Sequence, residues 1–302
     1  MSNILIYGGL LIDRYLIVDR YPAPGGDGFI LDSADMVGGC AVNIAKAVKN
    51  LGGVPFIVSA VGNDHWGGTI MSYMQKERLP ADCIRRTEGN TGYCFVFLEP
   101  NGERTFLTSK GCETEYTDTL VPKDTEDACR VAAVTGYYLL GDTSGMVTDR
   151  LRGFKRGGGK IVFDPCPLAD KIKASYLDDM IGLSDVIAPN GQEARFLAGS
   201  QGYETPKQWA LSCNQRGKSV IIKEGADGGT LYENGESTPY AAACAKTVDT
   251  TGAGDAFTGV IAYAVSEGIP LGEAVALAAR AAGIIVSVKG PHGAFDMEAL
   301  KC

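Results

Sequence analysis

The chain has 302 residues, 45% of them hydrophobic, and a formal net charge of −8, which suits one large α/β domain over residues 1–302. No run of lysine and arginine exceeds two residues and no apolar stretch is long enough to cross a bilayer, so nucleic-acid and membrane partners are not expected. The nine cysteines form no C-x-x-C pair and only two histidines accompany them, which disfavours structural zinc and predicts a reducing, cytoplasmic location.

Short β-branched runs alternate with helical patterns along most of the chain. Strands are predicted at 4–7, 55–59, 131–135, 160–163, 186–188 and 220–223. Helices are predicted from about 41, near 69–77, 146–156, 191–197 and 206–214, and around 254–266 and 272–287. This repetition predicts a three-layer α/β sandwich with a mainly parallel central sheet, in which ligands bind beyond the carboxyl ends of the strands.

Residues 91–109 interrupt that alternation. Two strand-like runs, 91–98 and 104–109, flank the turn-forming string Glu-Pro-Asn-Gly-Glu, which favours a hairpin. Tyr93, Phe95 and Phe97 project to one side and the residues between them to the other, so both faces are apolar. One face could close over a substrate while the other meets a second subunit. A central strand of the main sheet fits the same periodicity equally well.

Two early segments carry candidate substrate-binding residues. Gly8 lies at the end of the first predicted strand, and Asp13 follows it five residues later. Gly38 and Gly39 precede a predicted helix, where they permit close approach of a ligand, and Asn43 can present its amide to hydroxyl groups. Taken alone, these are also common features of strand ends and helix starts.

Two later segments carry candidate nucleotide-binding and metal-binding residues. Asn190 is followed three positions later by Glu193. The two residues are either an ordinary helix cap or a pair that positions a cation. Lys223 ends a predicted strand, and Gly225 and Gly228 follow it as hairpin glycines or as the border of a nucleotide site. A carboxylate near Mg²⁺ is physically required in ATP chemistry, because the phosphate charges must be neutralised before a nucleophile can approach.

Residues 249–259 read Asp-Thr-Thr-Gly-Ala-Gly-Asp-Ala-Phe-Thr-Gly, a glycine-rich turn that enters an apolar helix. The N–H groups of Gly252, Ala253 and Gly254 lie at a helix N-terminus, where they have no intrahelical acceptor and can bind an anion. Asp255 would then sit beside that anion and accept the proton of an attacking hydroxyl. This arrangement is typical of phosphoryl transfer.

A plainer interpretation is that Asp249 or Asp255 only caps the helix. Other phosphate motifs are absent from the sequence: there is no G-x-x-x-x-G-K-[ST] string and no dinucleotide fingerprint after a strand.

Taken together and in order, these motifs resemble the signatures of the ribokinase-like (PfkB) carbohydrate kinase family along nearly the whole chain. The resemblance implies a ribokinase-like α/β fold with a small β lid formed by segments of about 12–37 and 91–110, and a homodimer through that lid. It implies ATP and Mg²⁺ as cofactors, and K⁺ bound by backbone carbonyls beside the glycine turn, with 287–294 as the second half of that site. The residues it implies are Asp13, Gly38, Gly39 and Asn43 for the substrate, Asn190 and Glu193 for Mg²⁺, Asn190, Lys223, Gly225, Gly228 and Thr251 for the nucleotide, and Asp255 with Gly252, Ala253 and Gly254 for catalysis.

The sequence departs from the ribokinase pattern at two substrate positions, where Leu11 stands in place of Asn and Cys40 in place of Lys. Leucine cannot bind a sugar hydroxyl, and the missing cation argues against a phosphorylated acceptor. Arg104 could reach a substrate or a lid carboxylate.

The predicted function is therefore ATP-dependent phosphorylation of a hydroxyl on a small neutral sugar. A nucleoside kinase is the first alternative, with Tyr93, Phe95, Phe97 and Phe106 as residues that could stack a base. A non-catalytic relative that binds sugar or nucleotide is the second.

Overall fold

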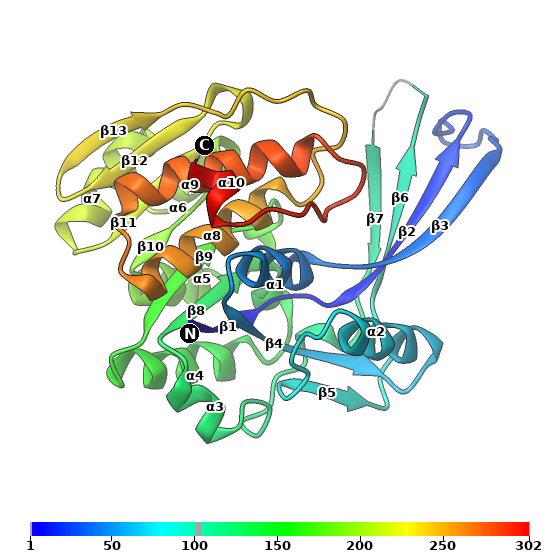
Figure 1. The fold of residues 1–302 in the computed structure, drawn as a ribbon, viewed down its shortest axis with the longest axis horizontal. Coiled ribbons are helices and arrows are strands. Elements are labelled where there is room, and N and C mark those ends of the chain that lie inside the picture. The colour runs from blue at the N-terminus through cyan, green and yellow to red at the C-terminus, as the bar shows by residue number, and fades with distance from the viewer. Residues whose placement is uncertain (1, 101–103, 302) are drawn as a thin grey trace.

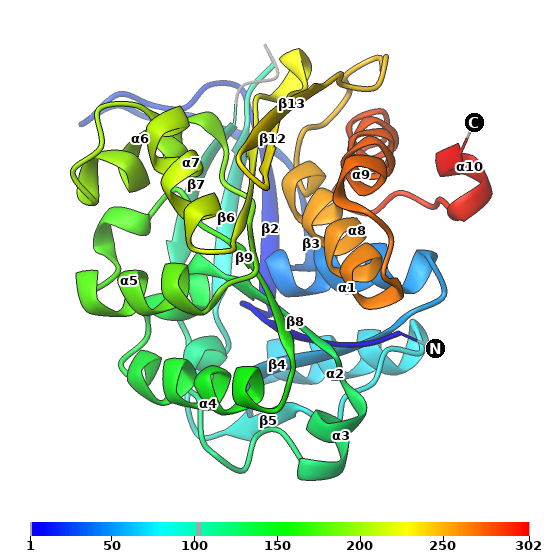
Figure 2. The same cartoon turned by 90° about the vertical axis from the view of Figure 1, so that its left-hand side faces the viewer.

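The computed structural model describes residues 2–100 and 104–301, and it has a three-layer α/β body with a smaller sheet beside it (Figure 1). Figure 2 shows the central sheet between two layers of helices, with α4 to α7 on one side and α1, α8 and α9 on the other. This arrangement confirms the predicted fold class. No helix within the described ranges combines the length and the apolar character that crossing a bilayer would require.

Across the described ranges, the large sheet has nine strands. Neighbouring strands are parallel except at one edge, where β11, β12 and β13 pair antiparallel. The strand order is β13 (Glu236–Tyr240), β12 (Gly229–Glu233), β11 (Ser219–Lys223), β10 (Val186–Ile187), β9 (Lys160–Asp164), β8 (Val131–Thr135), β1 (Asn3–Tyr7), β4 (Val54–Gly62) and β5 (Ile84–Thr87).

Helices cover the two sides of this sheet and bury apolar faces there, except α3, which has no buried residue. They are α1 (Cys40–Asn50), α2 (His65–Lys76), α3 (Lys123–Ala128), α4 (Ser144–Arg156), α5 (Ala174–Leu183), α6 (Gly191–Ser200), α7 (Pro206–Gln215), α8 (Ala253–Glu267), α9 (Leu271–Val286) and α10 (Met297–Lys301). Single 3₁₀ turns lie at Cys112–Thr114, Gly136–Leu140, Ala169–Lys171 and Gly225–Asp227.

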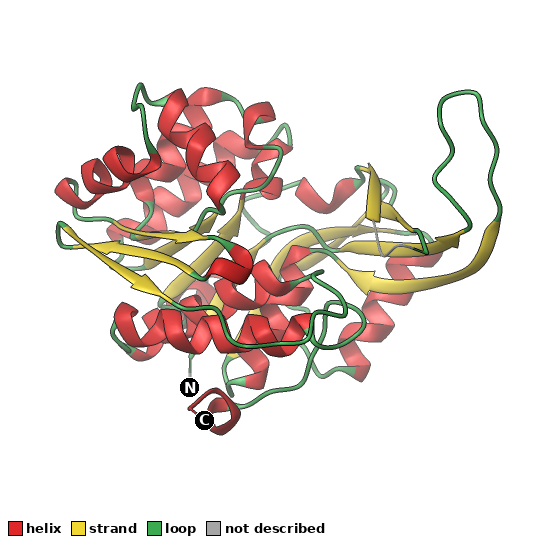
Figure 3. Cartoon of the chain, turned by 90° about the horizontal axis from the view of Figure 1, so that it is seen from above, coloured by secondary structure: helices red, strands yellow, loops and turns green. Residues whose placement is uncertain are grey.

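The smaller sheet has the order β3 (Ile30–Gly38), β2 (Leu11–Val18), β6 (Tyr93–Leu98) and β7 (Arg104–Ser109). The antiparallel pairing of β6 with β7 confirms the predicted hairpin and excludes a place in the central sheet. Its turn residues Asn101, Gly102 and Glu103 lie outside the described residues. The segment between β2 and β3 extends furthest from the body (Figure 3). We call these four strands the lid sheet.

The lid sheet is attached to the body through the turn before α2. Asp64 is the N-cap of α2 and accepts a hydrogen bond from the N–H of Gly67 at 2.7 Å. The same carboxylate accepts from the N–H and the hydroxyl of Thr91, each at 2.7 Å, two residues before β6. One acid therefore fixes the start of a helix and the base of the hairpin.

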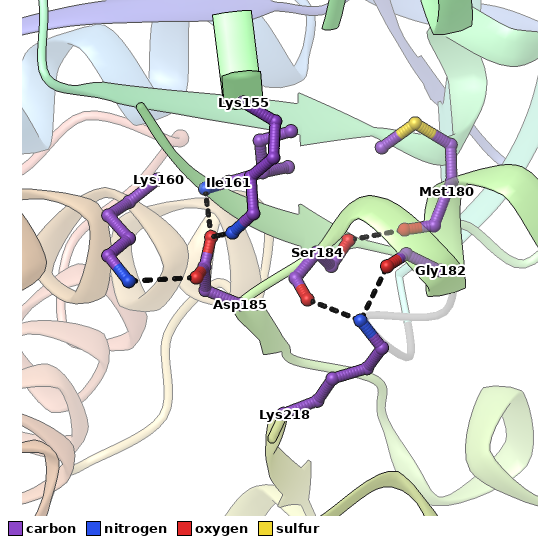
Figure 4. A network of polar contacts seen from close by, with 8 residues as sticks. All are labelled: Lys155, Lys160, Ile161, Met180, Gly182, Ser184, Asp185 and Lys218. Carbon is purple, nitrogen blue, oxygen red and sulfur yellow. Dashed lines mark hydrogen bonds and ion pairs between the residues drawn. The ribbon is translucent and has the colours of Figure 1, made fainter. Parts of the chain in front are cut away.

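At the amino ends of the central strands β9 and β10, a network of charged groups connects neighbouring elements (Figure 4). Asp185, just before β10, pairs with Lys155 and with Lys160 and accepts from the N–H of Ile161 at 2.9 Å. Burial acts to raise the pKa of Asp185, but the hydrogen bonds from these groups outweigh it and hold the pKa below its ordinary value. This network lies at the amino end of β9 and is structural, because the candidate site lies at the carboxyl ends.

Candidate active site

A cavity of about 780 Å³ lies at the carboxyl ends of the central strands, as expected for a parallel sheet. It brings together residues that are far apart in the sequence, from the start of α1 to the α8–α9 pair. Most of the predicted catalytic and nucleotide-binding residues line it: Asn190, Glu193, Lys223, Gly225, Gly228, Gly252, Ala253, Gly254 and Asp255.

The glycine turn forms the N-terminus of α8. Gly252 is the N-cap residue and is left-handed, with φ of 78°, and an added Cβ would lie 2.8 Å from Cβ of Pro291. Backbone conformation and packing therefore both require glycine there. At Gly254 an added Cβ would lie 3.8 Å from Nζ of Lys223, so this position faces open space beside an ammonium group. The N–H of Ala253 makes only a long bond, 3.4 Å, to the carbonyl of Thr250.

Asp255 lies in the first turn of α8, but its carboxylate does not act as a simple helix cap. Its Oδ2 accepts a hydrogen bond from Nδ2 of Asn43 on α1 at 2.7 Å. Burial raises the pKa of Asp255 to about 7, with further upward contributions from Asp164 and Asp13 and downward ones from Asn43 and Lys223. A carboxylate with such a pKa can exchange a proton near neutral pH, which is what a general base requires.

Asp13, Gly38 and Gly39 lie together where β2 pairs with β3. Burial raises the pKa of Asp13 to about 6, and a hydrogen bond from the N–H of Gly39 partly offsets this effect. A Cβ at Gly38 would overlap Oδ2 of Asp13, and Gly39 has φ of 92°. The pair of glycines is therefore needed to seat the acid against the start of α1.

Asn190 and Glu193 form a reciprocal cap at the start of α6. Oδ1 of Asn190 accepts from the N–H of Glu193 at 2.9 Å, and Oε2 of Glu193 accepts from the N–H of Asn190 at 2.8 Å. Glu193 is only 6% exposed, and burial and the nearby Asp164 raise its pKa to about 7, while Lys223 lowers it. The pair caps a helix and also lines the cavity, so the two interpretations of this motif are compatible.

Lys223 at the end of β11 is paired across the cavity with a residue that the sequence motifs did not single out. Its Nζ lies 2.8 Å from Oδ1 of Asp164, whose Oδ2 accepts from the hydroxyl of Thr258 on α8. Asp164 is the last residue of β9 and is 7% exposed. An acid at the carboxyl end of a parallel strand, before a proline, is the sequence signal that could have indicated it.

The loop after β11 carries the two predicted nucleotide-binding glycines. Both have positive φ, 61° at Gly225 and 82° at Gly228. A Cβ at Gly228 would overlap the carbonyl of Tyr240, whereas nothing lies within 4 Å at Gly225. Gly228 thus allows close packing of the loop on β13, and Gly225 leaves open space at the cavity edge.

Asp249 connects three segments beside the cavity. Its carboxylate accepts from the N–H of Thr251 at 2.8 Å and from that of Gly290 at 3.0 Å, and its Oδ1 lies 3.2 Å from a guanidinium nitrogen of Arg104 on β7. Asp249 is therefore a loop anchor and not the cap of α8, whose N-cap is Gly252.

The predicted contacts of Arg104 with substrate and of Thr251 with nucleotide stay predictions, because the structure places both residues at Asp249. The neighbouring Thr250, not Thr251, is part of the cavity lining.

The register of the lid sheet corrects one expectation about the aromatic residues. Asp13 is paired with Cys94, so Tyr93, Phe95 and Phe97 lie on the opposite face of the sheet from Asp13. They form a row of neighbouring rings there, and Phe95 and Phe97 line a separate surface pocket. These three rings cannot stack a base beside Asp13. Phe106, paired with Val96, shares the face of Asp13.

The comparisons with known proteins agree with the fold. The model of the "pfkB family carbohydrate kinase" family matches residues 1–296. The chain therefore belongs to the PfkB family of carbohydrate kinases, which are ATP-dependent phosphotransferases.

Three individual proteins illustrate the range of the similarity. An uncharacterised sugar kinase of Escherichia coli K12, YegV, is 28% identical over 296 residues, which cover 96% of this chain and 90% of that protein. Arabidopsis thaliana ribokinase, solved with ribose and ATP, has a TM-score of 0.83 and 22% identity, covering 100% of this chain and 98% of that one. A Burkholderia thailandensis nucleoside kinase, solved with inosine, has a TM-score of 0.81 and 20% identity, covering 98% and 94%.

Proposed function

We propose that this protein transfers the γ-phosphoryl group of ATP to a hydroxyl of a small neutral sugar, with Asp255 as the general base. The observation that carries the proposal is the placement of Asp255. It lies in the first turn of α8, next to the glycine turn and in the same cavity as Lys223. A base, an anion cradle and a cation in one cavity are the groups that in-line phosphoryl transfer uses.

In the proposed reaction Asp255 accepts the proton of the acceptor hydroxyl. The oxygen forms a new bond to the γ-phosphorus as the bond from that phosphorus to the β,γ-bridging oxygen breaks, and ADP leaves with that oxygen. The N–H groups of Gly252 and Gly254 bind the negative charge on the transferred group. Lys223 supplies a positive charge within reach of Gly254.

The residues beside the cavity fit Mg²⁺ bound largely through water. Glu193 and Asp164 are both buried, with the Lys223 ammonium as a nearby positive charge, so a bound divalent cation would stabilise their ionised forms. The described residues contain no cluster of three or more His, Cys, Asp or Glu side chains that would coordinate a metal directly. Mg²⁺ suits such a site, because it retains waters and uses phosphate oxygens as ligands. When bound, it would neutralise phosphate charge.

The acceptor we favour is an uncharged sugar. Cys40, which lines the cavity, is neutral, and Asn43 and Asp13, which lie near Asp255, carry no positive charge that could pair with a phosphorylated acceptor. Relatives of the same fold have been solved with ribose and with inosine, so both classes of acceptor occur on this fold. The nucleoside alternative is weakened because three of the four rings named for base stacking, Tyr93, Phe95 and Phe97, face away from Asp13, while Phe106 shares its face. A purely binding protein would not need a base with a raised pKa beside a phosphate cradle.

The proposal extends to closure of the lid sheet, to a homodimer, to a bound K⁺ and to the cellular compartment. The Arg104–Asp249 pair would hold the lid sheet against the glycine turn. The outward pocket lined by Leu16, Phe95 and Phe97 would be covered by a second copy of the chain.

Contact between Gly252 and Pro291 brings together the two segments whose carbonyls would bind K⁺. We place the reaction in the cytoplasm, where thiols such as those of this chain stay reduced.

The proposal is tested by measuring ADP release with Mg·ATP and K⁺ across ribose, fructose, other hexoses, adenosine, inosine, cytidine and pseudouridine. We expect turnover with a sugar and little with the nucleosides. The product would be identified by ³¹P NMR, which names the phosphorylated hydroxyl. Turnover restricted to a nucleoside would replace the sugar assignment. ATP binding without turnover on any acceptor would favour the non-catalytic alternative.

A further inference from the structure

His292 is a polar residue that neither the sequence motifs nor the reaction described above uses. It lies in the segment between α9 and α10, and its Nε2 is 3.0 Å from Oδ1 of Asn43. Asn43 is only 6% exposed, and its Nδ2 donates to Asp255 at 2.7 Å. Both ends of the Asn43 amide are therefore engaged, one by the histidine and one by the proposed base.

The direction of these hydrogen bonds follows from which atoms can donate. The carboxylate of Asp255 only accepts, so the amide must turn its NH₂ toward it and its oxygen toward His292. The histidine must then carry its proton on Nε2, which leaves Nδ1 as an acceptor. The hydroxyl of Tyr73, 3.5 Å from Nδ1, lies on that side, and its ring stacks on the imidazole.

The charged groups around His292 agree with a neutral ring. Burial, with a further contribution from Lys46 on α1, lowers the pKa of His292 to about 4, while Glu77 at the end of α2 acts weakly in the other direction. Lys46 and Glu77 are themselves paired at 2.5 Å. A neutral histidine protonated on Nε2 donates from that atom, so it faces the oxygen and not the NH₂ of the neighbouring amide.

The segment that carries His292 is held firmly on both sides. The N–H of Gly290 donates to Asp249, and the carbonyl of Gly293 accepts from Asn50 of α1 at 2.9 Å. Pro291 packs against Gly252 of the phosphate cradle. The imidazole is thus fixed relative to α1 and to the turn that contains the proposed base.

We propose that His292 is a positioning residue for the phosphoryl transfer: by donating from Nε2 to Oδ1 of Asn43, it orients the Asn43 amide so that its NH₂ is presented to Asp255. This inference rests on the proposed function, because Asp255 is taken as the base. Without the histidine donor the amide can turn, and its oxygen then faces the carboxylate, which favours the protonated form of Asp255. The groups that face Asp255 besides Asn43 are Asp13, Asp164, Lys223, Cys40 and Tyr137.

The test compares His292→Leu, which removes the donor, with His292→Gln, whose side-chain NH₂ can replace Nε2–H. We expect the acidic limb of the kcat/KM profile to move up by about one pH unit in His292→Leu, because a hydrogen bond to the charged form of Asp255 is weakened. His292→Gln should restore the limb to within a few tenths of a pH unit. His65→Leu, at the exposed start of α2, is the matched control and should leave the limb unchanged.

A second measurement needs no activity. Long-range ¹H–¹⁵N NMR of the two histidines, with His65→Leu as the assignment aid, should show His292 neutral and protonated on Nε2 at pH 7. A proton on Nδ1 with none on Nε2 would overturn the inference. So would an unmoved acidic limb in a folded His292→Leu protein, or equal limb shifts in the leucine and glutamine variants. Full turnover by Asp255→Asn would instead refute the proposed function, and the NMR result would still decide the orientation of Asn43.

Discussion

The raised pKa of Asp255 predicts that Asp255→Asn will stabilise the fold at neutral and alkaline pH. The pKa rises from an ordinary 3.8 to about 7 in the folded protein, so ionising this carboxylate costs the folded state up to ~4 kcal/mol. Solvent in the cavity screens the charge, and we expect roughly half of that figure to be observed. Asparagine can still accept the hydrogen bond from Asn43, so the fold should be retained.

The stabilising effect of Asp255→Asn should depend on pH in a definite direction. Because the folded pKa is raised, the penalty is absent below about pH 4, grows as the pH rises through the interval up to about 7, and is constant above it. Thermal unfolding of wild type and Asp255→Asn at pH 5 and pH 8 measures it directly. We expect the variant to melt about 3 °C or more above wild type at pH 8, with a smaller difference at pH 5. A variant equally stable or less stable at both pH values would refute the reasoning.

Three further predictions concern the cradle, the lid and the structural network. Gly254→Ala should fold normally, since its Cβ would lie 3.8 Å from the nearest group. It should lower kcat, because the methyl group would occupy the proposed phosphoryl site. An unchanged kcat would contradict the placement of the phosphoryl group at Gly254. Arg104→Ala should lower kcat/KM about tenfold or more, because it removes a charged hydrogen bond to Asp249. Arg152→Ala, which removes a half-exposed pair between α4 and α5, is the control and should change it little. Equal effects of the two variants in steady-state kinetics would show that the Arg104–Asp249 pair has no role. Asp185→Asn should lower the melting temperature above pH 5 and have little effect at pH 3, because the pKa of Asp185 is depressed in the folded state. Thermal unfolding at the two pH values measures the difference.

The central sheet could be predicted from the sequence because its strands are continuous apolar runs, buried on both faces. The runs around β1, β8 and β9 illustrate this pattern. The outer lid strand β3 could not be recognised in the same way, since most of its residues are exposed and its sequence has no clear alternation. The short edge strands β5 and β13 were missed for a similar reason.

The sequence motif led to the place of Asp255 in the cavity lining, while its role stays a prediction. Contacts that depend on the tertiary fold could not be predicted in this way. The alternation of Tyr93 and Phe95 correctly placed them on one face, but only the register with β2 shows that this face is turned away from Asp13. Asp164 was missed because it pairs with a lysine 59 residues later, and His292 because its partner lies 249 residues earlier in the chain.

The most direct test of the central claim is the turnover of Asp255→Asn on the acceptor that wild type phosphorylates, measured with ATP binding to the same preparation. Removal of a general base predicts a fall in kcat of at least ~10²–10⁴-fold with ATP affinity close to wild type. Turnover near the wild-type rate would contradict the assignment of Asp255 as the base that activates the acceptor hydroxyl.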